Sequence, residues 1–256
     1  MTNHINTSNF ILPNVISAPS CAKSDEPGHA VIILASGLSQ RLGQSKQLLS
    51  KHGELLIRYM TRVALATQPH IVIIVIPQHQ PVISDAINGL INQYVRIQSV
   101  VNSVPETGMG HSLYLGIEAL TNFDSSLFNR VLIMGVDQIL LTNDHLMKLL
   151  AAKSSVVASS YQHLDESRLN EQKLNKPCID ESISTDNSRE NIIGLPIVIN
   201  YERLKQWQSV LIGDKGLRHL IRALPPNQLS TVINHQLGHD IDTPKQLSYA
   251  RQQRWL

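Results

Sequence analysis

An alternation of short apolar segments with longer segments of helical period constrains the fold of this chain most strongly. The short segments are rich in β-branched residues and lie at 29–36, 70–77, 95–101, 129–137 and 154–161. Several lack polar alternation, which is typical of strands covered on both faces. Stretches of helical period lie at 54–68, 81–93, 110–120 and 143–153. Strand–helix–strand repeats favour right-handed crossovers, so the sequence predicts a doubly wound three-layer α/β fold with a mostly parallel sheet.

The second half of the chain continues this pattern. Apolar segments at 192–200 and 229–235 predict two more strands, and 201–210 and 217–224 predict helices. Thr243 is a favourable helix cap and is followed by Pro244, so a last helix is expected there.

Two segments depart from the pattern. Residues 163–191 are polar with only isolated apolar side chains, which predicts a surface insertion at about 163–191. Residues 1–28 are polar and interrupted by prolines, which favours a loose leader. We therefore expect a single domain over 29–256 that carries this insertion.

Charge and cysteine usage exclude several classes of protein. The chain has 22 Lys and Arg against 20 Asp and Glu, and a net charge of +2 gives no reason to expect nucleic acid or an anionic membrane as partner. Cys21 and Cys178 are far apart and form no CxxC pair, which argues against a disulfide framework and a zinc site. The short apolar run near the N-terminus is not preceded by Lys or Arg, so no signal peptide or membrane span is expected. A cytoplasmic location fits these features.

The stretch "ILASGLSQRLGQSKQLL" at 33–49 begins as a strand and continues as a glycine-containing loop. Gly37 and Gly43 allow backbone N–H groups to approach an anion closely. Arg41 and Lys46 add a forked and a point-like cation for phosphate oxygens. Because ligands of open α/β sheets bind beyond the carboxyl ends of the strands, the loop predicts polyphosphate binding. It matches neither a P-loop nor the dinucleotide fingerprint, and an ordinary strand-to-helix turn is the alternative.

Asp137 ends an otherwise apolar strand and should face the same crevice. A carboxylate about 4 Å from a phosphate would repel it by roughly 4 kcal/mol per charge pair at an effective dielectric constant near 20, so a shared cation is required. Hard oxygen ligands and phosphate select Mg²⁺ over zinc or copper. The alternative role for Asp137 is a helix cap or a solvated loop residue.

The loop resembles the signature LAAGxSxRMGxxKxLL of the molybdenum cofactor nucleotidyltransferases, which attach CMP or GMP to molybdopterin. Five further segments resemble segments of that family in the same order: "NSVPETGMGHSLYLGIEAL", "VLIMGVDQILLTNDHLMKLL", "GLPIVIN", "IGDKGLRHLI" and "HDIDTPKQL". The resemblance covers about 29–250. It implies a three-layer Rossmann-like nucleotidyltransferase fold with a mostly parallel sheet. It also implies an enzyme that moves NMP from an NTP to a phosphate acceptor and releases pyrophosphate.

The resemblance also implies the residues of the site. Those for the nucleotide are Leu34, Ala35, Ser36, Gly37, Ser39, Arg41, Gly43, Lys46, Gly108 and Ser112. The resemblance implies that the catalytic residues are Arg41, Lys46 and Asp137. It also implies that Asp137 binds Mg²⁺ with Asp242 as the second carboxylate.

Several of these residues have ordinary structural alternatives. Gly108 and Ser112 can equally begin a helix, and Asp240 and Asp242 can be caps ahead of "TPKQ". Asp214 can face the acceptor or belong to a plain turn.

The sequence departs from the family pattern at three places. Ile139 stands where the DQP motif has proline, which puts the geometry of the turn after Asp137 in doubt. Leu195 replaces the histidine of the GHP motif, which removes a polar group near the acceptor. The insertion at 163–191 is longer than the usual connection. These departures predict an altered acceptor pocket beside an intact triphosphate site.

The choice of nucleotide depends on small features of the motifs. Ser36 precedes Gly37, where the cytidylyltransferases often have Ala and the guanylyltransferases Gly, while "DQ", "GLP" and "DIDTP" favour the cytidylyltransferases. We expect CTP and molybdopterin as substrates and a molybdoenzyme as a partner that receives the cofactor. The alternatives are another NTP such as GTP, a sugar or polyol phosphate acceptor, and a non-catalytic cofactor carrier. The GGxGTRLxP loop of sugar-nucleotide enzymes is not matched.

Overall fold

The computed structural model describes residues 28–162, 191–211 and 216–256. The expected leader at 1–28 and the expected insertion at about 163–191 therefore lie, apart from their last residues, outside the described residues. Asp214 also lies outside them.

A seven-stranded sheet forms the centre of the molecule, in the order β5-β4-β1-β6-β8-β7-β9. The strands are β1 (Gly28–Leu34), β4 (Ile71–Pro77), β5 (Ile97–Asn102), β6 (Phe128–Gly135), β7 (Val156–Tyr161), β8 (Ile192–Asn200) and β9 (Leu229–Ile233). Strand β8 runs antiparallel to β6 and β7, and the other neighbouring strands pair in parallel. The mostly parallel sheet expected from the sequence is confirmed, and each predicted strand is found within about two residues of its predicted bounds.

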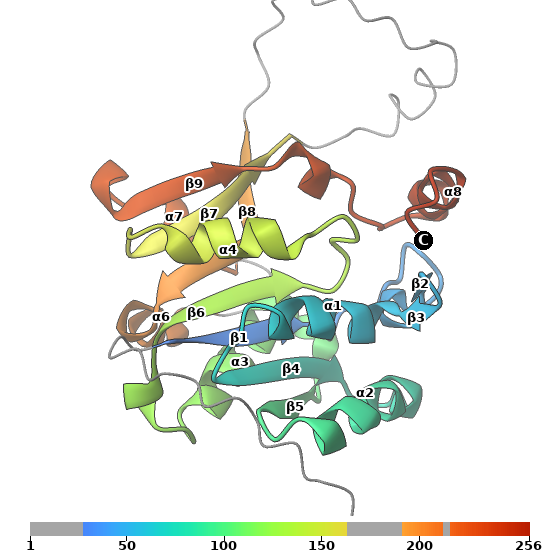
Figure 1. The fold of residues 1–256 in the computed structure, drawn as a ribbon, viewed down its shortest axis with the longest axis horizontal. Helices are drawn as coiled ribbons and strands as arrows, with labels where there is room; N and C mark the ends of the chain where they lie inside the picture. The colour runs from blue at the N-terminus through green and yellow to red at the C-terminus, as the bar shows by residue number, and fades with distance from the viewer. Residues whose placement is uncertain (1–27, 163–190, 212–215) are drawn as a thin grey trace, which may run out of the picture.

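Helices cover both faces of this sheet (Figure 1). One face carries α1 (Leu56–Leu65), α2 (Pro81–Gln93), α4 (Asn143–Ala151) and α8 (Pro244–Gln252). The other carries α3 (Met109–Leu120), α6 (Tyr201–Gln208) and α7 (Arg218–Arg222). Short 3-10 helices are η1 (Lys46–Leu48), η2 (Pro105–Thr107), η3 (Ser125–Leu127), η5 (Pro226–Gln228) and η6 (His235–Gly238).

The helix expected at 54–68 begins later than its pattern predicts. Residues Glu54–Leu55 form β3, which pairs antiparallel with β2 (Ser50–Lys51), and α1 starts only at Leu56. The backbone of Leu56 donates a 2.7 Å hydrogen bond to the carbonyl of Leu49. The small hairpin therefore connects the glycine-containing loop to α1.

Strand β1 shows why the sheet is buried on both faces. Val31 and Ile33 pack into the core under α1 and α2. Ala30 and Ile32 pack into the core under α3, and all four residues are fully buried. Helix α3 lies so close to the sheet at Gly116 that a Cβ at this position would come within 2.8 Å of Ile32 Cγ2.

The register of the central strands places the loops that matter for function side by side. Leu34 at the end of β1 pairs with Gly135 at the end of β6. Parallel strands end at the same edge of the sheet, so the loop after β1 and the turn after β6 meet there. Within the described residues, no helix has the length and apolar character needed to cross a lipid bilayer.

Candidate active site

The loop after β1 has a conformation that keeps its backbone open. Ser39 and Gly43 adopt φ values of 52° and 74°, in the left-handed region that favours glycine. The backbone N–H groups of Leu42 and Gly43 each donate a 3.1 Å hydrogen bond to the carbonyl of Ser39. A Cβ at Gly37 or Gly43 would meet no atom within 4 Å. The absence of side chains at these glycines therefore leaves room beside the backbone, as the phosphate-binding hypothesis requires.

Gln47 fixes this loop, and the sequence analysis did not identify it. Its side chain is 1% exposed and donates hydrogen bonds of 2.6 Å and 2.9 Å to the carbonyls of Ala35 and Gly37. The backbone of Lys46 donates a 3.2 Å hydrogen bond to Ser39 Oγ. The one sequence signal for this role of Gln47 was its polar amide side chain, which stands directly before Leu48 and Leu49.

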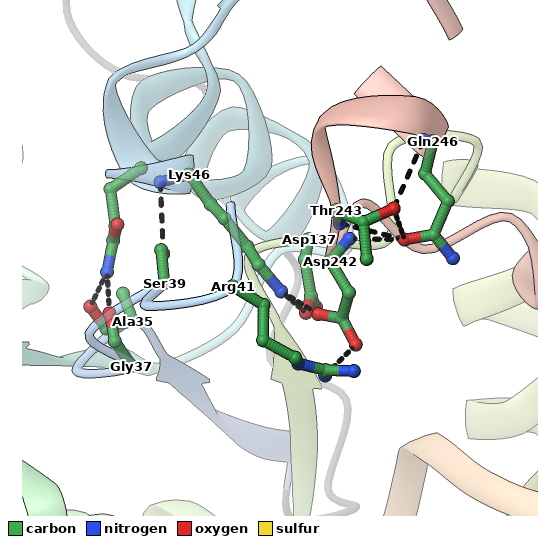
Figure 2. Close-up of polar contacts among 10 residues, drawn as sticks. Ala35, Gly37, Ser39, Arg41, Lys46, Asp137, Asp242, Thr243 and Gln246 are labelled. Carbon is green, nitrogen blue, oxygen red and sulfur yellow. Dashed lines mark hydrogen bonds and ion pairs between the residues drawn. The ribbon is translucent and has the colours of Figure 1, made fainter. Parts of the chain in front are cut away.

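A cluster of two cations and two carboxylates forms where this loop meets the turn after β6 (Figure 2). Lys46 Nζ lies 3.0 Å from Asp137 Oδ2 and also donates a hydrogen bond to Asp242 Oδ1. Arg41 pairs with the other oxygen of Asp242. The fold thus brings together all three predicted catalytic residues and both predicted metal ligands.

The electrostatics of the cluster favour the charged forms of Lys46 and Asp242. Burial alone would lower the pKa of Lys46, but the nearby charges of Asp137 and Asp242 outweigh it and raise this pKa. Burial would raise the pKa of Asp242, but its hydrogen bonds and ion pairs with Lys46 and Arg41 hold this pKa below its usual range. The formal charges of the two cations and the two carboxylates cancel.

Asp242 is not the cap of the last helix. Thr243 is the cap of α8, and its side chain accepts a hydrogen bond from the backbone of Gln246 in a capping box. The backbone N–H of Asp242 donates to Gln246 Oε1 at 2.8 Å. The capping box therefore leaves the carboxylate of Asp242 to the charged cluster.

The turn after Asp137 is held without the proline of the family motif. The backbone N–H of Ile139 donates a 2.9 Å hydrogen bond to the carbonyl of Asp137, which a proline could not do. The Ile139 side chain is fully buried. The ammonium of Lys51, whose residue is 4% exposed, donates to the carbonyls of Ile139 at 2.5 Å and Trp255 at 3.2 Å. These contacts hold the turn after Asp137 where the family motif has proline.

Gly108 and Ser112 lie at the start of α3. Gly108 is the cap residue and has a φ of 95°, a value that favours glycine on structural grounds alone. Ser112 is 3% exposed, shares a 2.5 Å hydrogen bond with the Ser36 hydroxyl and accepts one of 3.1 Å from Asn102. Both serines are therefore engaged with protein groups, and their direct contact with a nucleotide stays a prediction.

A cavity of about 920 Å³ opens beside Asp137 on the α3 side of the sheet. Leu34, Leu195 and Asp240 line it, so the predicted residue Leu34 faces this cavity. Gln138 also lines it and donates a 2.6 Å hydrogen bond to the carbonyl of Leu195. Leu195, where the family motif has histidine, therefore lies in the cavity wall, and the altered acceptor pocket stays a prediction.

The cluster fits a metal that is shared with a substrate. Asp137 and Asp242 offer carboxylate oxygens within reach of one cation, as their common contact with Lys46 demonstrates. No group of three or more His, Cys, Asp or Glu that could hold a metal occurs within 28–162, 191–211 and 216–256. Magnesium is usually held by one or two carboxylates together with substrate phosphates, so this donor set suits it.

Comparison with known proteins gives a consistent result. A family model described as the MobA-like NTP transferase domain matches residues 31–230. Among solved structures, a nucleotidyl transferase from Methanothermobacter thermautotroptrophicus, Mth528, has a TM-score of 0.63 and 16% identity over 89% of this chain and 97% of that one. The inositol-1-phosphate CTP transferase of T. maritima has a TM-score of 0.60 and 14% identity over 90% and 97%.

A third structure was solved with a metal. Rv0371C of Mycobacterium tuberculosis H37Rv, in complex with manganese, has a TM-score of 0.55 and 15% identity over 81% of this chain and 89% of that one. Identities this low show a shared fold, and the ligands named belong to those proteins. No curated protein matches the sequence.

Proposed function

The chain belongs to the MobA-like NTP transferase domain family, and we propose that it transfers CMP from CTP to the phosphate of molybdopterin, with Mg²⁺ as cofactor. Membership makes it a nucleotidyltransferase, while the base, the acceptor and the metal are parts of the proposal. A cytoplasmic location and a molybdoenzyme that receives the product belong to it as well.

The observation that carries this function is the contact of Lys46 with Asp137 and Asp242. Asp137 and Asp242 follow Lys46 in the sequence by 91 and 196 positions, yet both contact its ammonium. The contact lies at the edge of the sheet where ligands of open α/β folds bind. A structural role alone does not require two carboxylates around one lysine beside an open glycine loop. The two cations can turn to triphosphate oxygens when the two carboxylates turn to a divalent cation, so each charge keeps a partner.

The reaction requires positioning and charge neutralisation more than a protein nucleophile. An oxygen of the acceptor phosphate attacks the α-phosphorus of the NTP in line. The bond from this phosphorus to the oxygen bridging to the β-phosphate breaks, and pyrophosphate leaves with the electron pair. Lys46 and Arg41 hold the charge that accumulates on the triphosphate, and the loop pinned by Gln47 orients it. Mg²⁺, when bound by Asp137 and Asp242, supplies a Lewis acid for the phosphate oxygens.

The proposal puts the acceptor in the cavity beside Asp137. Arg218 and Arg222 line it and lie one turn apart on α7, so they share a face of that helix. Both are exposed, and neither forms an ion pair with another described residue. Two free guanidinium groups at a cavity mouth are suited to phosphate, which supports a phosphate-bearing acceptor.

The choice of CTP and molybdopterin rests on the family resemblance of the "DQ" motif at Asp137, the "GLP" segment and the "DIDTP" segment that contains Asp242. To test it, the purified protein is incubated with Mg²⁺, molybdopterin and each of the four NTPs. Pyrophosphate release with CTP alone would support the proposal. Pyrophosphate release with GTP instead would show that the substrate nucleotide is GTP and not CTP. NTP binding without pyrophosphate release would favour a non-catalytic cofactor carrier.

The metal assignment is tested by Asp137→Asn. We expect turnover to be lost while the circular dichroism spectrum stays unchanged, because the amide removes the charge but not the volume. Asp144→Asn is the matched control, since Asp144 lies on an exposed helix surface paired with Lys148. Normal activity of Asp137→Asn would remove this residue from the metal site.

A further inference from the structure

Three buried polar residues connect the ends of β5 and β1 through helix α3. Asn102 is the last residue of β5, Ser112 lies near the start of α3, and Ser36 lies in the loop after β1. The side-chain amide of Asn102 donates a 3.1 Å hydrogen bond to Ser112 Oγ, which lies 2.5 Å from Ser36 Oγ. We call these three residues the Asn102 network.

The backbone fixes the direction of the Asn102 amide. Its Oδ1 accepts a 3.0 Å hydrogen bond from the N–H of Val104, a group that can only donate. The Nδ2 group is therefore the end that faces Ser112, and the Ser112 oxygen must accept from it. The Ser112 hydroxyl proton is left for Ser36 Oγ or for the carbonyl of Gly108, which lies 3.4 Å away. Each polar atom of the Asn102 side chain thus has a partner, as a buried amide requires.

The Asn102 network spans a strand that lies between its two ends. Strand β4 separates β5 from β1 in the sheet, so the ends of β5 and β1 are two strand spacings, about 10 Å, apart. The side chains of Asn102 and Ser36 are too short to span this distance without a third group. Helix α3 packs against all three strands, which holds Ser112 where it supplies the connection.

The start of the glycine-containing loop is held from both faces of the sheet. On the α3 side, Ser36 is bonded to Ser112. On the other side, Gln47 donates to the carbonyls of Ala35 and Gly37 from η1, which contacts α1 and α2. The position of α3 is therefore transmitted to this loop through the Ser36 hydroxyl.

On the basis of the function proposed above, we propose that Asn102 is a positioning residue for the nucleotide. Through Ser112 and Ser36 it couples the start of α3 to the glycine-containing loop, the two segments for which the family resemblance implies nucleotide contact. The alanine or glycine that related enzymes often have in place of Ser36 carries no hydroxyl, so this protein has a connection that they lack. The two segments then respond to a bound nucleotide as one unit.

A double-mutant cycle on nucleotide affinity tests this coupling. Asn102→Ala and Ser36→Ala should each weaken nucleotide binding about three- to tenfold, the loss expected for one hydrogen bond. Because Ser36→Ala interrupts the path to the loop, adding Asn102→Ala should then have little further effect. Isothermal titration uses Mg²⁺ and the NTP that binds the parent protein most tightly, which we expect to be CTP. Two single effects that multiply in the double variant, or two single variants with unchanged affinity, would overturn the inference.

Stability separates positioning from a purely structural role. Asn102→Ala should lower the urea midpoint of the nucleotide-free protein in either background, because the N–H of Val104 loses its acceptor in both. Nucleotide affinity should respond to Asn102→Ala only while Ser36 is present. The same dependence on background in both measurements, or in neither, would contradict a positioning role.

Two further variants keep the test independent of folding. Ser112→Ala breaks the same path with a residue that suits a helix, so it should weaken nucleotide binding as much as Ser36→Ala, and the two together should weaken it no further. Thr61→Val is the matched control, because it removes a fully buried hydroxyl that donates to the Ile57 carbonyl of its own helix. An equal loss of nucleotide affinity in Thr61→Val would contradict a specific role of the Asn102 network.

Pyrophosphate release separates this inference from the proposed function. Coupled effects on nucleotide binding without pyrophosphate release would leave Asn102 as a positioning residue and refute the transfer reaction. Pyrophosphate release together with independent effects of Asn102→Ala and Ser36→Ala would confirm nucleotidyl transfer and overturn the inference. If none of the four NTPs binds the parent protein, both are refuted.

Discussion

Replacing Lys46 with methionine separates its two proposed roles. The change keeps the aliphatic stem but removes the ammonium that lies 3.0 Å from Asp137 Oδ2 and also contacts Asp242. The two carboxylate oxygens each lie within 3.0 Å of this ammonium, so they are less than about 6 Å apart and, at an effective dielectric constant near 20, repel each other by about 3 kcal/mol or more. Because they are 31% and 24% exposed, solvent relieves part of this. We expect the free energy of unfolding at pH 7 to fall by about 1–3 kcal/mol in the presence of a chelator.

The same variant should respond to metal and nucleotide in opposite directions. Free carboxylates attract Mg²⁺ more strongly, so Mg²⁺ should stabilise Lys46→Met more than it stabilises the parent protein. CTP should bind about 10- to 100-fold more weakly, because one charged hydrogen bond to phosphate contributes about 1.5–3 kcal/mol.

Urea denaturation with chelator or with Mg²⁺ measures the first two effects, and calorimetric titration with CTP measures the third. Lys148→Met is the matched control, because Lys148 forms an exposed helix-surface pair with Asp144 that is worth less than about 1 kcal/mol. If Lys46→Met is as stable as the parent in chelator and gains nothing from Mg²⁺, the cluster is not a preformed cation site. Unchanged CTP affinity would remove Lys46 from the triphosphate site.

Two further predictions concern Lys51, which contacts the turn after Asp137, and His29 in strand β1. Lys51→Met removes the donor to the Ile139 carbonyl and should lower the free energy of unfolding by about 1–3 kcal/mol; turnover should fall more than CTP affinity, and unchanged pyrophosphate release would exclude a positioning role. Burial, with the charges of His70 and Arg130, lowers the pKa of His29 from 6.5 to about 4. The unfolded chain therefore binds the proton first, and stability should fall by up to about 3 kcal/mol between pH 6.5 and 4. Urea denaturation across this range should show a flatter profile for His29→Gln, and an identical profile would contradict the assignment.

Much of the fold follows from local patterns in the sequence. Runs of β-branched apolar residues gave the strands of the sheet, since a strand buried on both faces needs no polar alternation. The pattern was weaker at Glu54–Leu55, where a two-residue strand is too short to show any period. Glycines with Arg41 and Lys46 indicated the phosphate loop, because these residue types are suited to anions wherever the loop lies.

The partners of the site residues were harder to predict. Gln47 and Lys51 hold the loop and the turn through backbone carbonyls, and a carbonyl acceptor leaves no mark on the sequence around it. The proline absent at Ile139 suggested a weakened turn, whereas the donor that compensates comes from a hairpin 88 residues away. The structure places Leu195 in the cavity wall, and the altered acceptor pocket that its motif predicted stays a prediction.

Apart from the β2–β3 hairpin, the sequence by itself determined the kind and order of the main strands and helices, because backbone propensity and hydrophobic period act over neighbouring residues. Only the tertiary structure decided that β8 runs antiparallel, since the same apolar run fits either direction in a buried sheet. It also decided that Asp242, 196 residues from Lys46, completes the charged cluster while Thr243 caps the helix. Contacts between distant residues depend on where the whole sheet places its strand ends, and no local pattern contains that information.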